Sequence, residues 1–135
     1  LAAQGFQESR INQKLRSPAG AVGIMQIMPA TYREIRARNP FLADIDEPRW
    51  NIAAGIFYDR QLYRKWKKKP AIQTGERLKF AFASYNAGYG KILKSHKRAA
   101  GEGGAVKRWQ DVAPHAPGET RRYVRRIEGL MQGEG

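Results

Sequence analysis

The sequence contains no cysteine and is poor in acidic residues. The absence of cysteine excludes a disulfide framework and a thiolate metal site. The chain has 12 Asp and Glu but 25 Lys and Arg, which gives a formal net charge of +13. No apolar stretch approaches the length that a membrane-spanning helix needs. The charge predicts an anionic partner, such as nucleic acid, an anionic membrane surface or a bacterial wall polymer.

Acidic residues are scarcest at the start of the chain. Glu8 is the only one among the first 33 residues, because the next is Glu34. It lies in an apolar stretch that is typical of the last turns of a helix. On the wall of an apolar cleft a carboxyl group has a raised pKa, and it can then donate a proton near neutral pH. A lone Glu on a helix is usually a solvated surface residue, so this interpretation depends on other motifs.

The apolar spacing predicts a mainly helical chain. A helical face repeats over residues 51–66, where Ile52, Gly55, Leu62 and Trp66 recur at intervals of three, four and seven. No alternation of apolar and polar residues favours a strand. The other segments expected to be helical are 24–28, stopped by Pro29; 32–38, capped by Thr31 and ended by Asn39-Pro40; 78–85; a stretch through 92–93; and a last helix that starts near Glu119.

The expected architecture is one domain over residues 1–135. At this length a chain can bury a real core. It would hold about seven short helices joined by Gly- and Pro-rich loops. In the last helix, Tyr123, Val124, Ile127, Leu130 and Met131 are expected to face inward.

Three sequence motifs occur in order, and a weaker fourth follows them. They are Glu8-Ser9; the fifteen residues SPAGAVGIMQIMPAT at 17–31; AFASYNAG at 81–88; and Glu119-Thr120 followed by Tyr123-Val124. Together they resemble the catalytic domain of family 1 lytic transglycosylases, the soluble-lytic-transglycosylase type with a goose-lysozyme-like fold. The resemblance covers nearly the whole chain. It is strongest to the membrane-bound lytic transglycosylase F branch, in which another domain precedes the catalytic one, and a segment of a longer protein is therefore expected.

This resemblance implies a substrate cleft and a non-hydrolytic reaction on peptidoglycan. Such enzymes cleave the β-1,4 bond between N-acetylmuramic acid and N-acetylglucosamine and form a 1,6-anhydro end. A glycosidase normally needs two carboxylates. The motif region offers only Glu8, which suits a group that acts first as general acid and then as general base. No cofactor or metal is expected.

The resemblance also implies a set of substrate-binding residues. Ser17 would hydrogen-bond Glu8 or the substrate N-acetyl group, unless it only forms a turn before Pro18. Met25 would line the cleft, with Met28 in the core. The remaining predicted contacts are Gln26, Tyr85, Asn86, Glu119 and Tyr123. For Tyr85 the alternative is a half-buried core tyrosine, and for Glu119 a carboxylate that stabilises a helix N-terminus.

Two other functions stay open at this point. A hydrolytic muramidase on the same fold would need a second carboxylate, for which Asp44, Asp46, Asp59 and Glu119 are candidates. A basic module that binds nucleic acid or wall polymer would use the charge together with Trp50, Trp66 and Trp109. No nucleic-acid motif is present, so we expect no nucleic-acid partner.

The expected partner is the peptidoglycan glycan strand, because muramyl peptides and wall polymers carry carboxylates and phosphates. A cluster at Lys65, Lys67, Lys68 and Lys69 would steer such a substrate, although charge runs are usually just solvated faces. The expected location is the bacterial cell envelope, in the periplasm or at the periplasmic face of the outer membrane, with a phage virion as the alternative. A monomeric domain is expected, with possible membrane attachment through parts outside this sequence.

Overall fold

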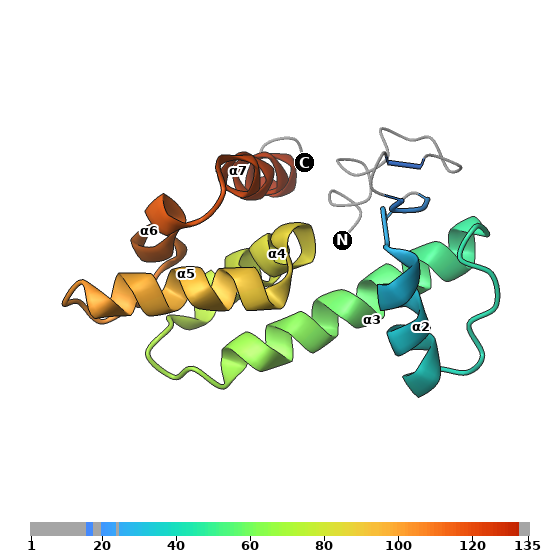
Figure 1. The fold of residues 1–135 in the computed structure, drawn as a ribbon, viewed down its shortest axis with the longest axis horizontal. Coiled ribbons are helices and arrows are strands. Elements are labelled where there is room, and N and C mark those ends of the chain that lie inside the picture. Colours follow the sequence, from blue (N-terminus) through green and yellow to red (C-terminus); the bar gives the residue numbers. More distant parts are fainter. Residues whose placement is uncertain (1–15, 18–19, 24, 133–135) are drawn as a thin grey trace. The chain divides into compact units, whose positions relative to one another are not determined.

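The structure is a computed structural model that describes residues 16–17, 20–23 and 25–132. Within these residues six α-helices and two short 3-10 helices follow one another, with two isolated β-bridges (Figure 1). The chain divides into two compact units, residues 1–58 and 59–135, and the boundary falls inside α3. The expectation of a mainly helical fold is confirmed for this part of the chain.

The first unit contains α2, Pro29–Arg38, and the first half of α3, Pro48–Lys67. Both helices begin at a proline, whose fixed φ suits the first helical position and whose missing N–H would have no partner there. Helix α2 therefore starts at Pro29, and the prediction that Thr31 caps it is wrong. Its end at Arg38, before Asn39, is as predicted. Tyr32 and Ile35 form its buried face.

Helix α3 was predicted from the correct segment, and Gly55, Leu62 and Trp66 of its predicted face are buried, but the first position of that face is wrong. Asn51, Ala54, Leu62 and Trp66 are buried, whereas Ile52 is 37% exposed. The polar Asn51 takes the inward position because its side chain finds buried hydrogen-bond partners, which an apolar periodicity cannot reveal.

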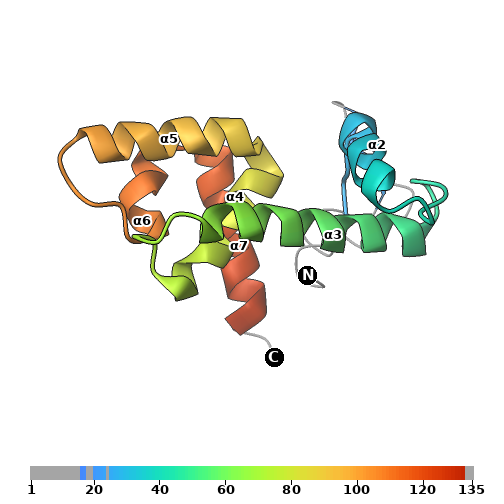
Figure 2. The ribbon, with the colours of Figure 1, turned by 90° about the horizontal axis from the view of Figure 1, so that it is seen from below.

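In the second unit, α4 (Arg77–Ala87) packs against both α5 (Tyr89–Gly101) and α7 (Gly118–Gln132) (Figure 2). The remaining elements are the 3-10 turn η1 (Thr74–Glu76), the one-turn helix α6 (Trp109–Val112) and the 3-10 turn η2 (Ala113–His115). All five residues from Phe80 to Ser84 are buried. A helix covered on several sides must be apolar around most of its circumference, and α4 is.

Aromatic rings form the centre of the second unit. The Trp66 ring lies 4.8 Å from that of Phe80, which in turn meets Trp109 edge-on at 5.4 Å. The indole nitrogen of Trp66 donates a 2.8 Å hydrogen bond to Ser84 Oγ, which satisfies two buried polar groups at once. In α7, Tyr123, Val124 and Ile127 face this core as predicted, but Met131 is 49% exposed because the last turn extends beyond the core.

Candidate active site

The predicted site residues fall into both units, and each group is described by itself. Ser17, Met25 and Gln26 belong to the first unit, whereas Tyr85, Asn86, Glu119 and Tyr123 belong to the second. Glu8, the predicted acid, lies outside the described residues.

Ser17 begins a tight loop. Its backbone N–H donates to the Ala21 carbonyl at 2.9 Å, and its hydroxyl oxygen accepts from the Ala21 N–H at 2.9 Å. Gly20 has φ +98°, in the left-handed region where glycine is the default residue. Ser17 therefore forms the turn. Because its hydroxyl accepts in that bond, its own hydrogen remains available to donate elsewhere.

Val22 and Ile27 close a turn, and the predicted short helix over 24–28 is wrong for the described residues 25–28. Val22 and Ile27 exchange two backbone hydrogen bonds of 2.9 and 3.0 Å, which close the loop like the end of a hairpin. Gln26 has φ +49°, and its side-chain amide donates to the Gly23 carbonyl at 2.8 Å. A five-residue apolar segment is too short to nucleate a helix unaided. Gln26 thus shapes the loop, and its contact with sugar stays a prediction.

The side chain of Asn51, fully buried in α3, holds this loop in place. Its Oδ1 accepts from the Met25 N–H at 2.8 Å, and its Nδ2 donates to the carbonyls of Val22 at 2.9 Å and Ile45 at 3.0 Å. One amide therefore joins the loop, the segment before α3 and α3 itself. The sequence analysis missed this residue. The signal was a polar side chain at the inward position of an apolar face.

Two glycines leave the space that this arrangement needs. A Cβ on Gly23, whose φ is +78°, would lie 2.5 Å from Asn51 Nδ2. A Cβ on Gly55 would lie 2.7 Å from the terminal methyl of Met25. Both contacts are shorter than atoms tolerate, so the two sites accept glycine alone without rearrangement.

The two methionines of the loop differ in exposure. Met25 is 2% exposed and packs against Gly55, whereas Met28 is 41% exposed. The prediction that Met28 belongs to the core is therefore wrong, because the turn leaves this side chain at the surface. The contact of Met25 with substrate stays a prediction.

Asn86, at the end of α4, is bonded to the start of α7. Its Oδ1 accepts from the buried Thr120 hydroxyl at 2.8 Å. This bond fixes the segment that precedes Gly88, whose φ of +96° ends α4 and allows α5 to begin. Thr120 was not predicted as a site residue, although it is the second residue of the fourth motif. Tyr85, one position earlier, is half-buried.

Glu119 and Tyr123 differ in accessibility. Glu119 is exposed in the first turn of α7, where a carboxylate is stabilised by the helix dipole. Tyr123 is 3% exposed and belongs to the hydrophobic core of the second unit. Their contacts with substrate stay predictions.

The carboxylates considered for a hydrolytic reaction differ in their surroundings. Asp44 Oδ1 accepts from the Asp46 N–H at 2.9 Å, and Asp46 forms an ion pair with Arg16. Asp59 is 4% exposed. None of these arrangements indicates a group that positions water, so no described contact favours the hydrolytic alternative.

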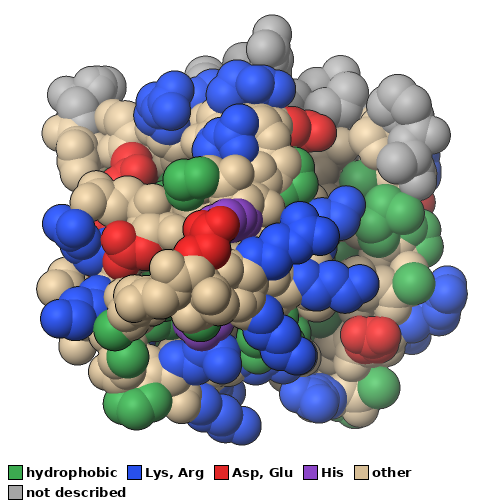
Figure 3. All heavy atoms as spheres, turned by 60° about the vertical axis from the view of Figure 1, so that its left-hand side comes forward, with side chains coloured by type: hydrophobic (Ala, Val, Ile, Leu, Met, Phe, Trp, Pro, Cys, Tyr) green, Lys and Arg blue, Asp and Glu red, His purple; other side chains and the backbone are tan. Residues whose placement is uncertain are grey.

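The tryptophans do not support a binding module built on exposed rings. Trp66 and Trp109 are 0% and 6% exposed, in the core of the second unit. Of the cationic cluster, Lys65 lies over the ring of Tyr89 at 4.6 Å. Figure 3 shows Lys and Arg side chains over much of the visible face, with only scattered acids among them.

Within the described part of the chain, no group of three His, Asp or Glu could hold a metal ion. No helix in the same part has the length and apolar character needed to cross a membrane. His115 instead bonds Glu102 at 2.9 Å.

Comparison with known proteins identifies the family to which this chain belongs. The model of the transglycosylase SLT domain matches residues 2–107. The chain belongs to the transglycosylase SLT domain family. The matched range contains Glu8, Asn51 and the Tyr85-Asn86 segment. It also contains the loop over positions 17–27 that includes Gly20 and Gly23, which we call the glycine loop.

Relatives of this SLT domain with curated names include membrane-bound lytic murein transglycosylase F of Yersinia enterocolitica, 33% identical over 98% of the chain. The protein of the same name from Vibrio campbellii is 29% identical over 99% of the chain. The chain spans about a quarter of the length of these relatives, 26% and 24%.

Solved structures of lytic transglycosylases share the fold. The 70 kDa soluble lytic transglycosylase of Escherichia coli is 28% identical and superposes with a TM-score of 0.74 over 95% of this chain and 20% of its own. Its complex with bulgecin A gives 0.75 over the same shares. An inactive Glu→Gln mutant of lytic transglycosylase Slt from Pseudomonas aeruginosa gives 0.72. The lysozyme-like helical fold expected from the motifs is confirmed.

Proposed function

We propose that this SLT domain is a peptidoglycan lytic transglycosylase that cleaves the bond between N-acetylmuramic acid and N-acetylglucosamine without water. The family match over residues 2–107 carries this proposal, because it includes Glu8 and all of the glycine loop. The curated relatives are named as lytic murein transglycosylases, which supports the same substrate for this chain.

In the proposed reaction Glu8 acts twice. Its carboxylic acid donates a proton to the glycosidic oxygen as the bond to C1 of the muramic residue breaks. The substrate's N-acetyl oxygen stabilises the positive charge that develops at C1. The Glu8 carboxylate then takes the proton of the C6 hydroxyl, whose oxygen attacks C1 and closes the 1,6-anhydro ring. Glu8 ends as it began, and no water is consumed.

The structure supports this proposal through the glycine loop. The turn at Gly20, where an added Cβ would meet only the Met28 methyl, at 4.0 Å, among the described residues, leaves backbone without a side chain that a sugar could approach closely. The Ser17 hydroxyl hydrogen can donate to Glu8 or to the N-acetyl oxygen, while its oxygen holds the turn. The partly buried bond from Thr120 to Asn86 Oδ1 fixes the third motif, and the Asn86 amide nitrogen can donate to sugar.

The setting that we propose is the bacterial cell envelope, because the named relatives are membrane-bound murein enzymes. None of the relatives reported above is a phage protein, so the phage alternative has no support. The proposed partner is the glycan strand.

Digestion of purified peptidoglycan, with mass spectrometry of the products, tests the proposal. We expect 1,6-anhydro products from the wild type, and a loss of about a thousandfold in their rate of formation with Glu8→Gln. Glu34→Gln, which removes the next carboxylate along the chain on exposed helix surface, is the matched control and should retain activity. Reducing-end products would instead indicate hydrolysis, and equal activity of both variants would exclude Glu8 as the acid.

A further inference from the structure

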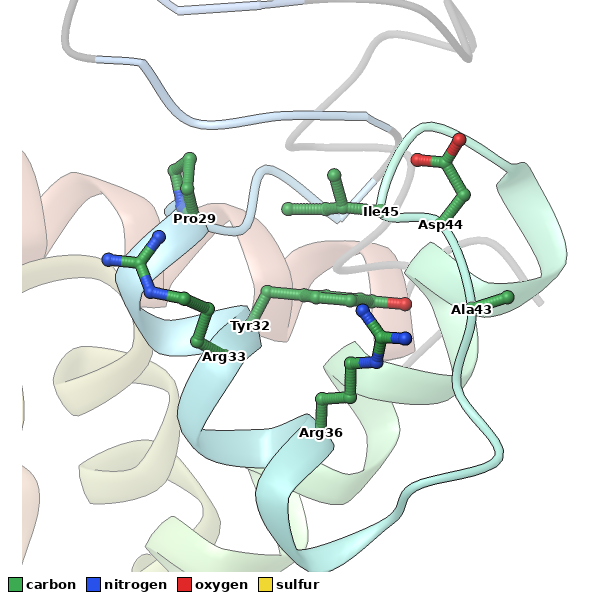
Figure 4. Close-up of a pocket in the computed structure, with 7 residues that line it drawn as sticks. All are labelled: Pro29, Tyr32, Arg33, Arg36, Ala43, Asp44 and Ile45. Carbon is green, nitrogen blue, oxygen red and sulfur yellow. The ribbon is translucent and has the colours of Figure 1, made fainter.

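A hollow of about 370 Å³ lies on the first unit, outside the residues that any motif assigns to the glycan. Tyr32, Arg33 and Arg36 of α2 form one side, and the segment from Ala43 to Ile45 forms the other (Figure 4). The Tyr32 ring lies across it beneath Ile45, with its hydroxyl beside the Arg36 guanidinium. Apolar and charged groups therefore face the same space.

The Tyr32 hydroxyl has no hydrogen-bond partner among the described residues. The side chain is 5% exposed, and its oxygen is shielded from solvent. Burial raises the pKa of Tyr32, against the opposing effect of Arg36, and the nearby Asp44 and Glu47 raise it further. The group is consequently protonated at neutral pH and can donate a hydrogen bond. A buried donor without an acceptor is costly, and a ligand oxygen would remove that cost.

The charges around the hollow favour a single negative charge. Arg33 and Arg36 form no ion pair with any described residue, while one oxygen of Asp44 accepts from the Asp46 N–H. Two cations and one anion leave a net charge of +1 on the lining. An arginine pairs well with a carboxylate through two parallel hydrogen bonds. One carboxylate balances this net charge, whereas a doubly charged phosphate would leave the site with a net charge of about −1.

The hollow is structurally joined to the glycine loop. Pro29, the first residue of α2, contributes to its lining and directly follows the loop. On the opposite side, the Ile45 carbonyl accepts a hydrogen bond from the Asn51 side chain, which is also bonded to Val22 and Met25. The buried Asn51 amide therefore supports both the loop and one side of the hollow.

We propose that this hollow binds a carboxylate of the peptide carried by the muramic acid residue, through Arg36, Arg33 and the Tyr32 hydroxyl. The inference rests on the proposed function, since only a peptidoglycan substrate presents such a peptide beside the cleaved bond. It assigns a substrate-selecting role to α2: strands that carry peptides bind more tightly than strands without them.

Calorimetric titration tests the site without requiring turnover. The ligands are muramyl-alanyl-glutamate with free carboxylates and the same compound with both carboxylates converted to amides. We expect the wild type to bind the free acid at least about tenfold more tightly, and Arg36→Gln or Tyr32→Phe to lose most of this difference. Arg38→Gln is the matched control, because it removes the same charge from an exposed position of α2 outside the hollow.

The outcomes separate the site from the reaction. Equal binding of acid and amide, or equal losses with Arg36→Gln and Arg38→Gln, would overturn the proposal. Competition by inorganic phosphate at lower concentration than acetate would also overturn it, because the hollow would then be a phosphate site. Carboxylate-dependent binding by a protein that forms no anhydro products would keep the site and remove the proposed reaction instead.

Discussion

Asn51 is the residue on which the loop of the first unit depends most directly. Its single side-chain amide is bonded to three backbone groups, the Met25 N–H and the carbonyls of Ile45 and Val22, of which the Val22 carbonyl also accepts from the Ile27 N–H. Glycine at positions 23 and 55 leaves the space for that amide and for Met25. Catalytic activity should therefore be sensitive to a residue that need not touch substrate.

We predict that Asn51→Leu, which keeps the branched shape of the side chain but removes its polar atoms, lowers the free energy of unfolding by about 3 kcal/mol. The reason is that the buried Met25 N–H and the partly buried Ile45 carbonyl would lose their bonds to this amide, and the Val22 carbonyl would keep only its bond from Ile27. Thermal or urea unfolding measures the change. Asn39→Ala is the control, because Asn39 makes one comparable bond, to the Ile35 carbonyl at the end of α2, and should cost about 1 kcal/mol. Similar costs for the two variants would contradict the role assigned to Asn51.

At the scale of the elements, Glu76 links α4 and α6 of the second unit directly, and it is linked to α7 through Lys79. Its carboxylate accepts from the Trp109 N–H at the start of α6 and from Lys79 in α4, both at 2.8 Å. Lys79 also approaches Glu128 of α7 at 3.2 Å. Burial acts to raise the pKa of Glu76, but the bonds from Lys79 and Trp109 outweigh it, so the pKa lies below that of a free glutamate.

A lowered pKa in the folded state means that the ionised carboxylate stabilises the fold. This contribution is fully present above the pKa of the unfolded chain, about 4.3, and is lost as the pH falls through the lower folded value. We predict that Glu76→Gln destabilises the protein by about 2 kcal/mol at pH 7 and that its difference from the wild type shrinks below about pH 4.

Urea unfolding between pH 2 and pH 7 checks this prediction. The control is Glu102→Gln, which removes the same charge from an exposed pair with His115 and should change stability little. A difference between Glu76→Gln and the wild type that stays constant across this pH range would show that folding does not lower the pKa of this carboxyl group.

At the scale of the whole molecule, the dominant property is the net charge of +13. The basic side chains are distributed over both units, and the tryptophans of the second unit are buried instead of presented to a ligand. Charge on this scale steers an anionic polymer to a surface but does not choose the bond that is cleaved.

We predict that binding to insoluble peptidoglycan weakens by about tenfold when the salt concentration is raised from 50 to 300 mM, because added salt screens the exposed charges. Cosedimentation measures it, and uncharged chitin serves as the matched polymer, for which little salt dependence is expected. Equal salt dependence on the two polymers would show that the charge does not act through the anionic groups of the wall.

The sequence alone determined the helical class, the order of the motifs and the family, because these depend on local spacing and on residue types that stand next to one another. It located α3 and α7 closely, because a long amphipathic helix places apolar residues at regular spacings that can be recognised in the sequence. It also singled out Ser17, Gln26 and Asn86, whose neighbours in the chain define their motifs.

Only the tertiary structure decided what those motifs do locally. Val22 and Ile27 close a turn where apolar composition predicted a helix, because Asn51 supplies bonds from 24 or more residues further along the chain. The same closure buries Met25 and exposes Met28, and the pairing of Thr120 with Asn86 joins residues 34 positions apart. The hollow at Tyr32 likewise exists only where α2 meets the segment before α3. Long-range hydrogen bonds and shared burial have no signature in local periodicity, which is why these features required the fold.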